Sequence, residues 1–392
     1  MKTFHLLLLP LVVLLFIRCQ KDGEPACYTK YTRLEEIGPP RKAWDKTVSN
    51  LRMLNNIAWF TSGGKALGVN MIDQTSFYVE NPTGVTLQIR NPDDIEHPYL
   101  GTSGNRLWIM DTDNKAWKLL FETPTGTVFG SMDFNLTSNH LPIVLKNESG
   151  PSTAVWLLDL NADSASEVVP LNQWVASNNF VTIGQPIYLP NAPVGPAIAL
   201  LVVDDSDTSS IALYNIEQQT VVRTIALSAF RRTTLVPDND RFCYDVIMGS
   251  YSTPPGMERV DLETGKILWT GLIADRKPID GYLLGASSFF GWESVGVYNA
   301  ETGESVHPLS WGISRNDYGG LLDGDMCFVG KDTTTTDSRK TRVVLVNPDT
   351  NCETMRISLP GKQELQAVLT YEPDKTILSF DVDGKLRLLK PK

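Results

Sequence analysis

The sequence predicts an all-β protein built as an eight-bladed β-propeller, a ring of small antiparallel sheets closed by an N-terminal strand. Three observations predict this fold. One hairpin recurs at nearly even spacing along the 392 residues, further strands precede each copy, and the last unit holds one strand too few. A ring of seven blades is the alternative.

The recurring hairpin is an apolar strand that ends in Asp or Asn, a polar turn, and a second apolar strand. The clearest copy is "VDLETGKILWTG" at 260–271, in which Glu263-Thr264-Gly265 makes the turn. Five copies have spacings of 56, 46, 38 and 48 residues, with a mean of 47. Their strand-ending residues are Asp159, Asn215, Asp261, Asn299 and Asn347.

Two more β-type runs precede each hairpin, as "TTLVP" and "RFCYDVIMG" precede Asp261. One unit is therefore four short antiparallel strands, which is the size of a propeller blade. A β-sandwich would also place strands at this spacing. It gives no reason for one hairpin to recur in register, so we favour the propeller.

The C-terminal unit decides the blade count. It has only three strands, "LQAVLTY", "TILSFDV" and "KLRLLK", and "CYTKYTRLEEI" at 27–37 can supply the fourth. Closure of this kind removes an exposed sheet edge. Residues 97–122 show three strands without a clear fourth. We expect blades to begin near residues 51, 97, 127, 179, 233, 281, 318 and 365.

The N-terminus has the composition of an export signal. Lys2 precedes an apolar run, Leu6 to Ile17, that is too short to span a bilayer. The run ends at Cys19 without a small-x-small cleavage site, which resembles a bacterial lipoprotein signal with Cys19 as the lipidated residue. Arg18 departs from that pattern, which usually has a small residue there. Ordinary secretion with a chance cysteine is the alternative.

The segment "QKDGEPAC" after the lipidation site resembles the export tags of surface lipoproteins in the Bacteroidetes. The resemblance implies a protein anchored by lipid to the outer membrane or cell surface. We expect a signal peptide at 1–18, a polar tether at 19–30 and a single propeller domain at 31–392.

Charge and cysteines narrow the functional classes. A net charge of −10 argues against nucleic acid as a partner, because phosphates call for a basic face. The wide spacing of Cys27, Cys243, Cys327 and Cys352 gives no CxxC metal or redox motif. If any disulfide forms, we expect it between Cys327 and Cys352.

The "ETGKILW" stretch, with weaker copies in "NAETGES" and "NPDTN", resembles the repeat of quinoprotein propellers. These include pyrroloquinoline-quinone alcohol dehydrogenases and the lipoprotein of the outer-membrane barrel assembly machinery. The dehydrogenases use adjacent cysteines beside the cofactor and several docking tryptophans. This chain has no adjacent cysteines, and Trp269 is its one well-placed docking tryptophan. We therefore predict no cofactor.

Recognisable catalytic motifs are missing from the sequence. The four histidines are scattered singly, and "GTSGN" at 101–105 fails the G-x-S-x-G pattern of a nucleophile elbow because it ends in Asn. Acidic stretches such as "DTDNK" at 111 and "DVDGK" at 381 do not complete a calcium loop, and we interpret them as turn formers. The sequence thus predicts neither a metal site nor an enzyme.

The loops between blades, and those between a blade's second and third strands, emerge on one face of a propeller and usually line its ligand site. On the predicted map they carry aromatic and arginine side chains, which favour a planar, sugar-like or anionic ligand, or a protein partner. The alternative is that the tryptophans pack between blades and the arginines are solvated. The candidate rim residues are Trp174, Phe230, Arg231, Arg232, Tyr251, Arg276, Trp292, Trp311, Arg315 and Tyr318.

Together these features predict a non-enzymatic surface lipoprotein whose propeller binds a small-molecule or glycan ligand, or an outer-membrane protein partner. Similar propeller lipoproteins of the Bacteroidetes accompany TonB-dependent transporters, which implies an accessory role in nutrient uptake. Two alternatives stay open. One is a scaffold in outer-membrane protein assembly, and the other is an enzyme, either a divergent quinoprotein or one that uses paired carboxylates.

Overall fold

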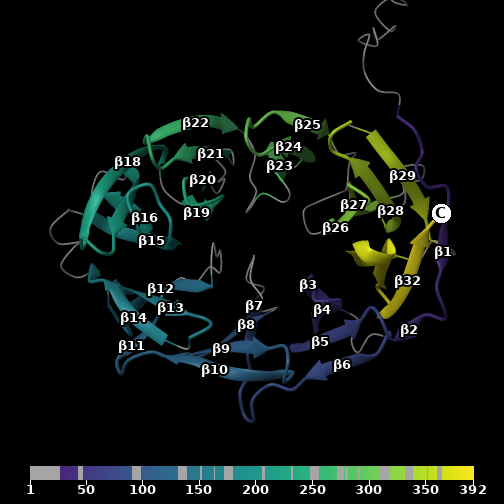
Figure 1. The fold of residues 1–392 in the computed structure, drawn as a ribbon, viewed down its shortest axis with the longest axis horizontal. Coiled ribbons are helices and arrows are strands. Elements are labelled where there is room, and N and C mark those ends of the chain that lie inside the picture. The colour runs from purple at the N-terminus through teal and green to yellow at the C-terminus, as the bar shows by residue number, and fades with distance from the viewer. Residues whose placement is uncertain are drawn as a thin grey trace, which may run out of the picture.

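The protein forms a closed ring of eight antiparallel sheets (Figure 1). The predicted eight-bladed propeller is confirmed, and the alternative of seven blades is wrong. In this computed structural model the described residues are 27–392, except 43–46, 91–98, 131–138, 151, 163, 172–179, 205–207, 231–232, 248–255, 272–277, 279–280, 290–291, 309–317, 332–338, 351 and 360–363. No helix in the described part is long and apolar enough to cross a membrane.

Each blade runs from a first strand near the middle of the ring to a last strand at the perimeter, as β3 to β6 show in Figure 1. Blades 1 to 3 are β3 (Ser49–Leu54), β4 (Ile57–Ser62), β5 (Lys65–Asn70) and β6 (Ser76–Val79); β7 (Gln88–Arg90), β8 (Leu100–Ser103), β9 (Arg106–Asp111) and β10 (Ala116–Glu122); and β11 (Thr127–Phe129), β12 (His140–Asn147), β13 (Ser152–Asp159) and β14 (Ser164–Val169).

The next three blades continue the same order, with three strands described in blade 6. Blades 4 to 6 are β15 (Phe180–Leu189), β16 (Ala197–Asp204), β17 (Thr208–Asn215) and β18 (Thr220–Phe230); β19 (Thr233–Pro237), β20 (Phe242–Ile247), β21 (Gly256–Asp261) and β22 (Lys266–Gly271); and β23 (Tyr282–Phe289), β24 (Trp292–Asn299) and β25 (Ser305–Pro308).

The last two blades complete the ring. Blade 7 is β26 (Tyr318–Leu322), β27 (Asp325–Lys331), β28 (Lys340–Asn347) and β29 (Cys352–Ser358). Blade 8 is β30 (Leu365–Tyr371), a 3-10 turn (Glu372–Asp374), β31 (Thr376–Asp381) and β32 (Lys385–Pro391), to which β1 (Leu34–Glu36) adds as the outer strand and β2 (Arg41–Lys42) also pairs.

Closure by the N-terminal strand is confirmed. Leu34 of β1 pairs with Pro391 of β32, and Glu36 pairs with Leu389, so the two ends of the chain share one sheet. The Arg387 guanidinium on β32 donates hydrogen bonds to both carboxylate oxygens of Glu36, at 2.8 and 3.0 Å. Blade 8 is thereby completed by a segment that precedes blade 1.

The strand-ending Asp and Asn of the sequence repeat have a local role. The Asp261 carboxylate accepts hydrogen bonds from the backbone N–H groups of Glu263 and Thr264, which fixes the turn between β21 and β22. Such Asx turns explain why only these two residue types end the strand. Equivalent backbone hydrogen bonds are accepted by the side chains of Asn70, Asp111, Asp159, Asn215, Asn299 and Asn347.

Buried apolar clusters lie between neighbouring blades. Eight clusters occur in the described residues, and each joins two adjacent blades, from blades 1 and 2 around to blades 8 and 1. At the last junction the Phe60 and Phe380 rings meet edge to face with centroids 5.0 Å apart. One blade cannot cover both of its faces alone, so burial of apolar surface holds the ring together.

Blade 2 differs from its prediction. Its first strand is β7 at Gln88–Arg90, not a strand near residue 97, and Ile89 of β7 pairs with Gly101 of β8. The fourth strand that residues 97–122 seemed to lack therefore lies upstream. It was missed because two of its three residues are Gln and Arg, so no apolar alternation marks it.

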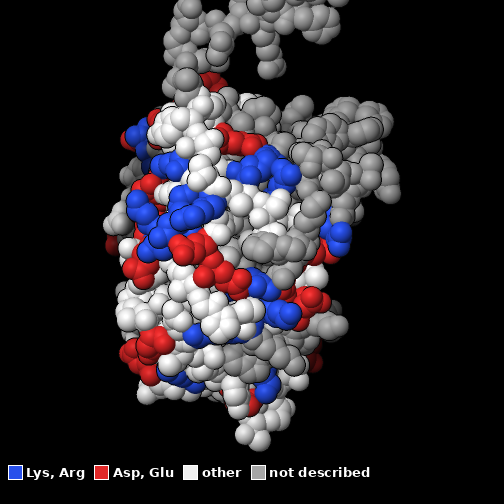
Figure 2. All heavy atoms as spheres, turned by 90° about the vertical axis from the view of Figure 1, so that its right-hand side faces the viewer, with Lys and Arg blue, Asp and Glu red and all other residues white. Residues whose placement is uncertain are grey.

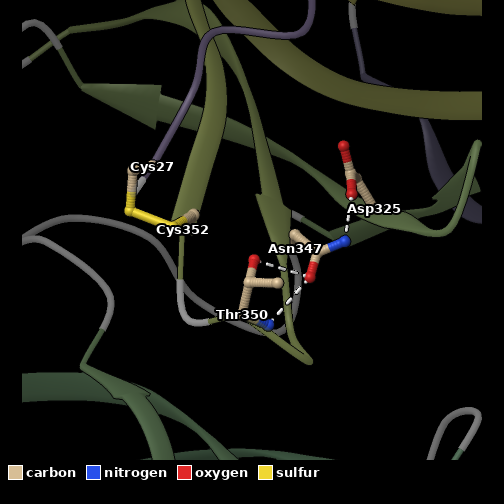
Figure 3. The surroundings of a disulfide bond; sticks show 5 residues. All are labelled: Cys27, Asp325, Asn347, Thr350 and Cys352. Atoms are coloured by element: carbon tan, nitrogen blue, oxygen red, sulfur yellow. Dashed lines mark hydrogen bonds between the residues drawn. A yellow bond between two sulfur atoms is a disulfide. The ribbon is translucent and has the colours of Figure 1, made fainter. Parts of the chain in front are cut away.

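The predicted Cys327–Cys352 disulfide is wrong. Cys352 instead bonds Cys27 (Figure 3). Cys327 is a buried free thiol. Cys327 lies on β27 and Cys352 on β29, and β28 runs between them. Two strand spacings amount to about 9.6 Å, which is beyond the Cα–Cα reach of a disulfide.

The turns define two faces of the ring. The hairpin-turn face carries the turns between first and second strands and between third and fourth strands. The two turns of a blade can bind each other, as in blade 5, where the Leu262 N–H donates to the Arg241 C=O at 2.8 Å. The long-loop face carries the turns between second and third strands and the connections between blades. These also meet, as Thr123 N–H donates to Asn105 C=O at 2.9 Å.

Candidate ligand-binding groove

Most predicted rim residues lie outside the described residues: Trp174, Arg231, Arg232, Tyr251, Arg276, Trp311 and Arg315. Phe230 ends β18 and Trp292 begins β24, and only their backbone is described. Tyr318 begins β26, and its half-buried ring lies 5.4 Å from that of Phe328, in the apolar cluster between blades 6 and 7. The Tyr318 side chain therefore takes part in packing between blades.

A groove opens on the long-loop face between blades 2 and 3, with a volume of about 490 Å³. One wall comes from the connection into blade 2 and from its first two strands, and the other comes from β11. None of the predicted rim residues is among its described lining residues. Its lining residues are Thr86, Gln88, Thr102, Ser103, Gly104, Val128, Phe129 and Gly130.

Local structure explains how the polar wall forms. Gln88 and Thr102 are directly opposite in the β7–β8 ladder. Ser103 closes the turn to β9 by pairing with Arg106. Gly104 in that turn has φ +59°, a left-handed conformation that favours glycine. The "GTSGN" stretch that fails as a nucleophile elbow is thus the tight turn at the edge of the groove.

The groove has the chemistry of a site for a neutral polar ligand. Its described lining residues offer three hydroxyl groups and one carboxamide, and none of them is charged. Val128 and the buried Phe129 supply an apolar side opposite these groups. Polar groups that set orientation beside an apolar wall are the usual composition of a small-molecule site.

A second groove, of about 360 Å³, lies on the perimeter between the N-terminal segment and β29. Glu353 and Arg356 in its lining bind each other through an ion pair. Its other wall consists of Thr29, Tyr31 and Thr32. These belong to the segment that closes the ring, so we assign this groove to closure and favour the long-loop groove as the ligand site.

Two buried carboxylates meet in blade 5. Asp245 on β20 and Glu258 on β21 are directly opposite in register, and both side chains are fully buried. The sequence could not show this convergence. The Thr270 hydroxyl lies 3.5 Å from Glu258, within the same sheet. A soluble substrate cannot reach this pair in the folded protein, so we assign it no catalytic role.

The free thiols and the carboxylates of the described residues form no further reactive centre. Burial raises the pKa values of the Cys243 and Cys327 thiols well above the usual range of a cysteine. Neither side chain therefore forms the thiolate, which is the nucleophilic form of cysteine. The Arg241 guanidinium lowers the pKa of the Asp261 carboxyl to about 2. Within the described residues, no three His, Cys, Asp or Glu side chains converge to hold a metal ion.

Comparison with known proteins supports the fold. No protein-family model matches the chain, and no curated protein matches its sequence. Among solved structures, the Dos1 propeller has a TM-score of 0.51 at 10% identity, over 90% of this chain and 94% of that one.

Two further structures resemble the chain at lower TM-scores. BamB from Moraxella catarrhalis has a TM-score of 0.46 at 12% identity, over 92% of this chain and 98% of that one. An oligogalacturonate lyase in complex with manganese has a TM-score of 0.48 at 14% identity, over 94% and 99%. At such identities the likeness concerns the fold alone, and the chain is similar in fold to β-propellers.

Proposed function

We propose that this protein is a non-enzymatic surface lipoprotein whose propeller binds a glycan or a similar neutral polar small molecule on its long-loop face. The groove between blades 2 and 3 carries the proposal, because it combines uncharged hydrogen-bonding groups with an apolar wall. Sugars present the same combination of hydroxyl groups and apolar ring faces.

The cellular setting belongs to the same proposal. Cys19 at the end of the apolar N-terminal run is the proposed lipidation site, and the outer membrane or cell surface is the proposed location. A propeller that captures a glycan there would supply a TonB-dependent transporter. Acyl-chain detection by mass spectrometry on the protein from the producing cell, with Cys19→Ala as control, tests the anchor.

Binding to the groove can be tested with two substitutions. The propeller is screened on an array of oligosaccharides, and the affinity of the best ligand is measured by calorimetry for wild type and for Gln88→Ala with Thr102→Val. Loss of two hydrogen bonds worth about 1 kcal/mol each weakens binding roughly 30-fold. Both positions are at least partly exposed, so the fold should tolerate the changes.

A matched control is Gln218→Ala, an exposed glutamine in the turn after β17 on the hairpin-turn face. We expect it to leave the affinity unchanged. An array without any bound glycan would refute the ligand class. Equal affinity of wild type and the double variant would refute the groove as the site.

A further inference from the structure

On the hairpin-turn face, the start of the N-terminal segment is fastened to blade 7 by a disulfide and by hydrogen bonds. We call residues 27–31 and their partners in blades 7 and 8 the clasp. Cys27 is bonded to Cys352, which directly follows the turn between β28 and β29 (Figure 3). The backbone N–H of Lys30 donates to the Thr354 C=O at 2.8 Å. The last four residues of the predicted tether, 27–30, are thus attached to blade 7.

Charged groups hold the clasp at the same face. The Lys30 ammonium donates to the backbone C=O of Asp323 at 2.7 Å and to the buried Asp325 carboxylate at 3.2 Å. The Tyr31 hydroxyl donates to the Asp323 carboxylate at 3.0 Å. Asp323 lies in the turn between β26 and β27 and also accepts a hydrogen bond from Lys375, in the corresponding turn of blade 8.

These contacts lower the pKa of the Asp323 carboxyl to about 2, chiefly through the hydrogen bonds from Lys375 and Tyr31. The Asp323 carboxylate is therefore charged throughout the physiological pH range. Figure 2 views the side of the ring formed by blades 7 and 8, where basic and acidic side chains lie intermixed. A disulfide and opposite charges together fix where the N-terminal segment leaves the propeller.

We propose that the clasp turns the hairpin-turn face toward the lipid bilayer, so that the long-loop face with its groove points away from the membrane. This inference rests on the proposed lipid anchor at Cys19. Cys27 lies eight positions after Cys19, and these eight steps of the chain span at most about 29 Å. An eight-residue strand such as β28 rises about 26 Å from one face to the other.

The tether length disfavours the opposite orientation. To set the long-loop face on the bilayer, the tether would have to run almost fully extended along the whole height of a blade. From the hairpin-turn face the same tether reaches the bilayer directly. The inference therefore follows from the position of Cys352 in blade 7 and from the reach of the chain.

The charge of the hairpin-turn face determines how the ring itself interacts with lipid headgroups. The described turns of this face are mainly acidic and include Asp73, Asp113, Glu217, Glu263, Glu301 and Asp349. Anionic lipid headgroups repel such a surface. The lipid anchor, not the surface of the ring, would then hold the protein on the membrane. The propeller without its anchor should not sediment with anionic vesicles.

The orientation is tested by energy transfer from single fluorophores to acceptor lipids in vesicles. A cysteine for labelling is introduced at Glu301→Cys on the hairpin-turn face, Leu268→Cys on the perimeter, or Val382→Cys on the long-loop face. The free thiols Cys243 and Cys327 are buried, so the introduced cysteine takes the label. The full-length protein is purified with its native anchor and inserted in vesicles.

Transfer should fall in the order 301, 268, 382, with roughly a twofold or larger difference between the two faces because a strand length separates them. The order should be lost when Cys27→Ser and Cys352→Ser free the tether. Equal transfer from residues 301 and 382, or the reverse order, would overturn the inference.

A parallel sample separates this inference from the anchor itself. Residues 1–19 are replaced by a hexahistidine tag, and the protein is captured on vesicles that contain nickel-chelating lipid. If mass spectrometry finds no acyl chain on Cys19, the proposed anchor fails, but the tagged protein still reports the orientation that the clasp imposes. The same order of transfer supports the inference, and equal transfer from both faces refutes it.

Discussion

Replacing Cys27 and Cys352 by serine should lower the stability of the ring by about 3 to 5 kcal/mol. The bond joins residues that are 325 positions apart, so in the unfolded chain it closes a very long loop. The chain-entropy model gives about 6 kcal/mol for a loop of this length, and measured disulfides usually contribute 2 to 5. The expected loss therefore lies in the upper part of the measured range.

Guanidinium unfolding measures this loss. Wild type and the Cys27→Ser, Cys352→Ser double variant are compared with and without reductant. A shift of the unfolding midpoint reports a change in stability when the dependence of the free energy of unfolding on denaturant is the same for both proteins. Reductant should lower the midpoint of wild type to that of the double variant and leave the double variant unchanged. Equal midpoints for the oxidised wild type and the double variant would refute the reasoning that the N-terminal segment is covalently held.

Three further substitutions test single contacts. Arg241→Met removes the cation that keeps the pKa of Asp261 near 2 instead of 3.8. The stabilisation of the fold by this ion pair is complete above pH 3.8 and is lost as the pH falls to about 2. Wild type and variant should therefore differ in melting temperature at pH 7 and converge near pH 2. Gly68→Ala places a Cβ 2.4 Å from Phe77 Cζ and should cost about 1 to 3 kcal/mol in thermal melts, a loss that Phe77→Leu relieves. Asp325→Ala leaves two side-chain donors, one of them buried, and the Lys30 ammonium without the carboxylate that accepts their hydrogen bonds. The loss should cost about 2 to 4 kcal/mol in urea unfolding. An unchanged midpoint would contradict the place of Asp325 in the clasp.

The candidate site was less predictable than the fold. The sequence favoured aromatic and arginine residues on the long-loop face, and most of these lie outside the described residues. The groove that the structure shows is lined by small polar residues from three separate segments, near Thr86, Thr102 and Val128. Single Thr, Ser and Gln residues carry no motif, so only their convergence in space marks the site.

Local chemistry explains what the sequence alone determined. A strand-ending Asp or Asn makes an Asx turn with residues two or three positions ahead. The repeat that reveals the blades therefore depends only on residues that are close together in the sequence. The missing fourth strand of the last unit is likewise visible by counting. The eight blades and the closure by the N-terminal strand therefore follow from the sequence.

Contacts between distant positions were decided only by the tertiary structure. Cys352 bonds Cys27 and not Cys327, because β28 lies between Cys327 and Cys352, which are nearer to each other in sequence. The clasp joins Lys30 to Asp325 across 295 positions, and no local pattern encodes such a pairing. Ring closure brings the first residues of the domain beside blade 7, and this position, set by the packing of all eight blades, fixes the face from which the chain leaves.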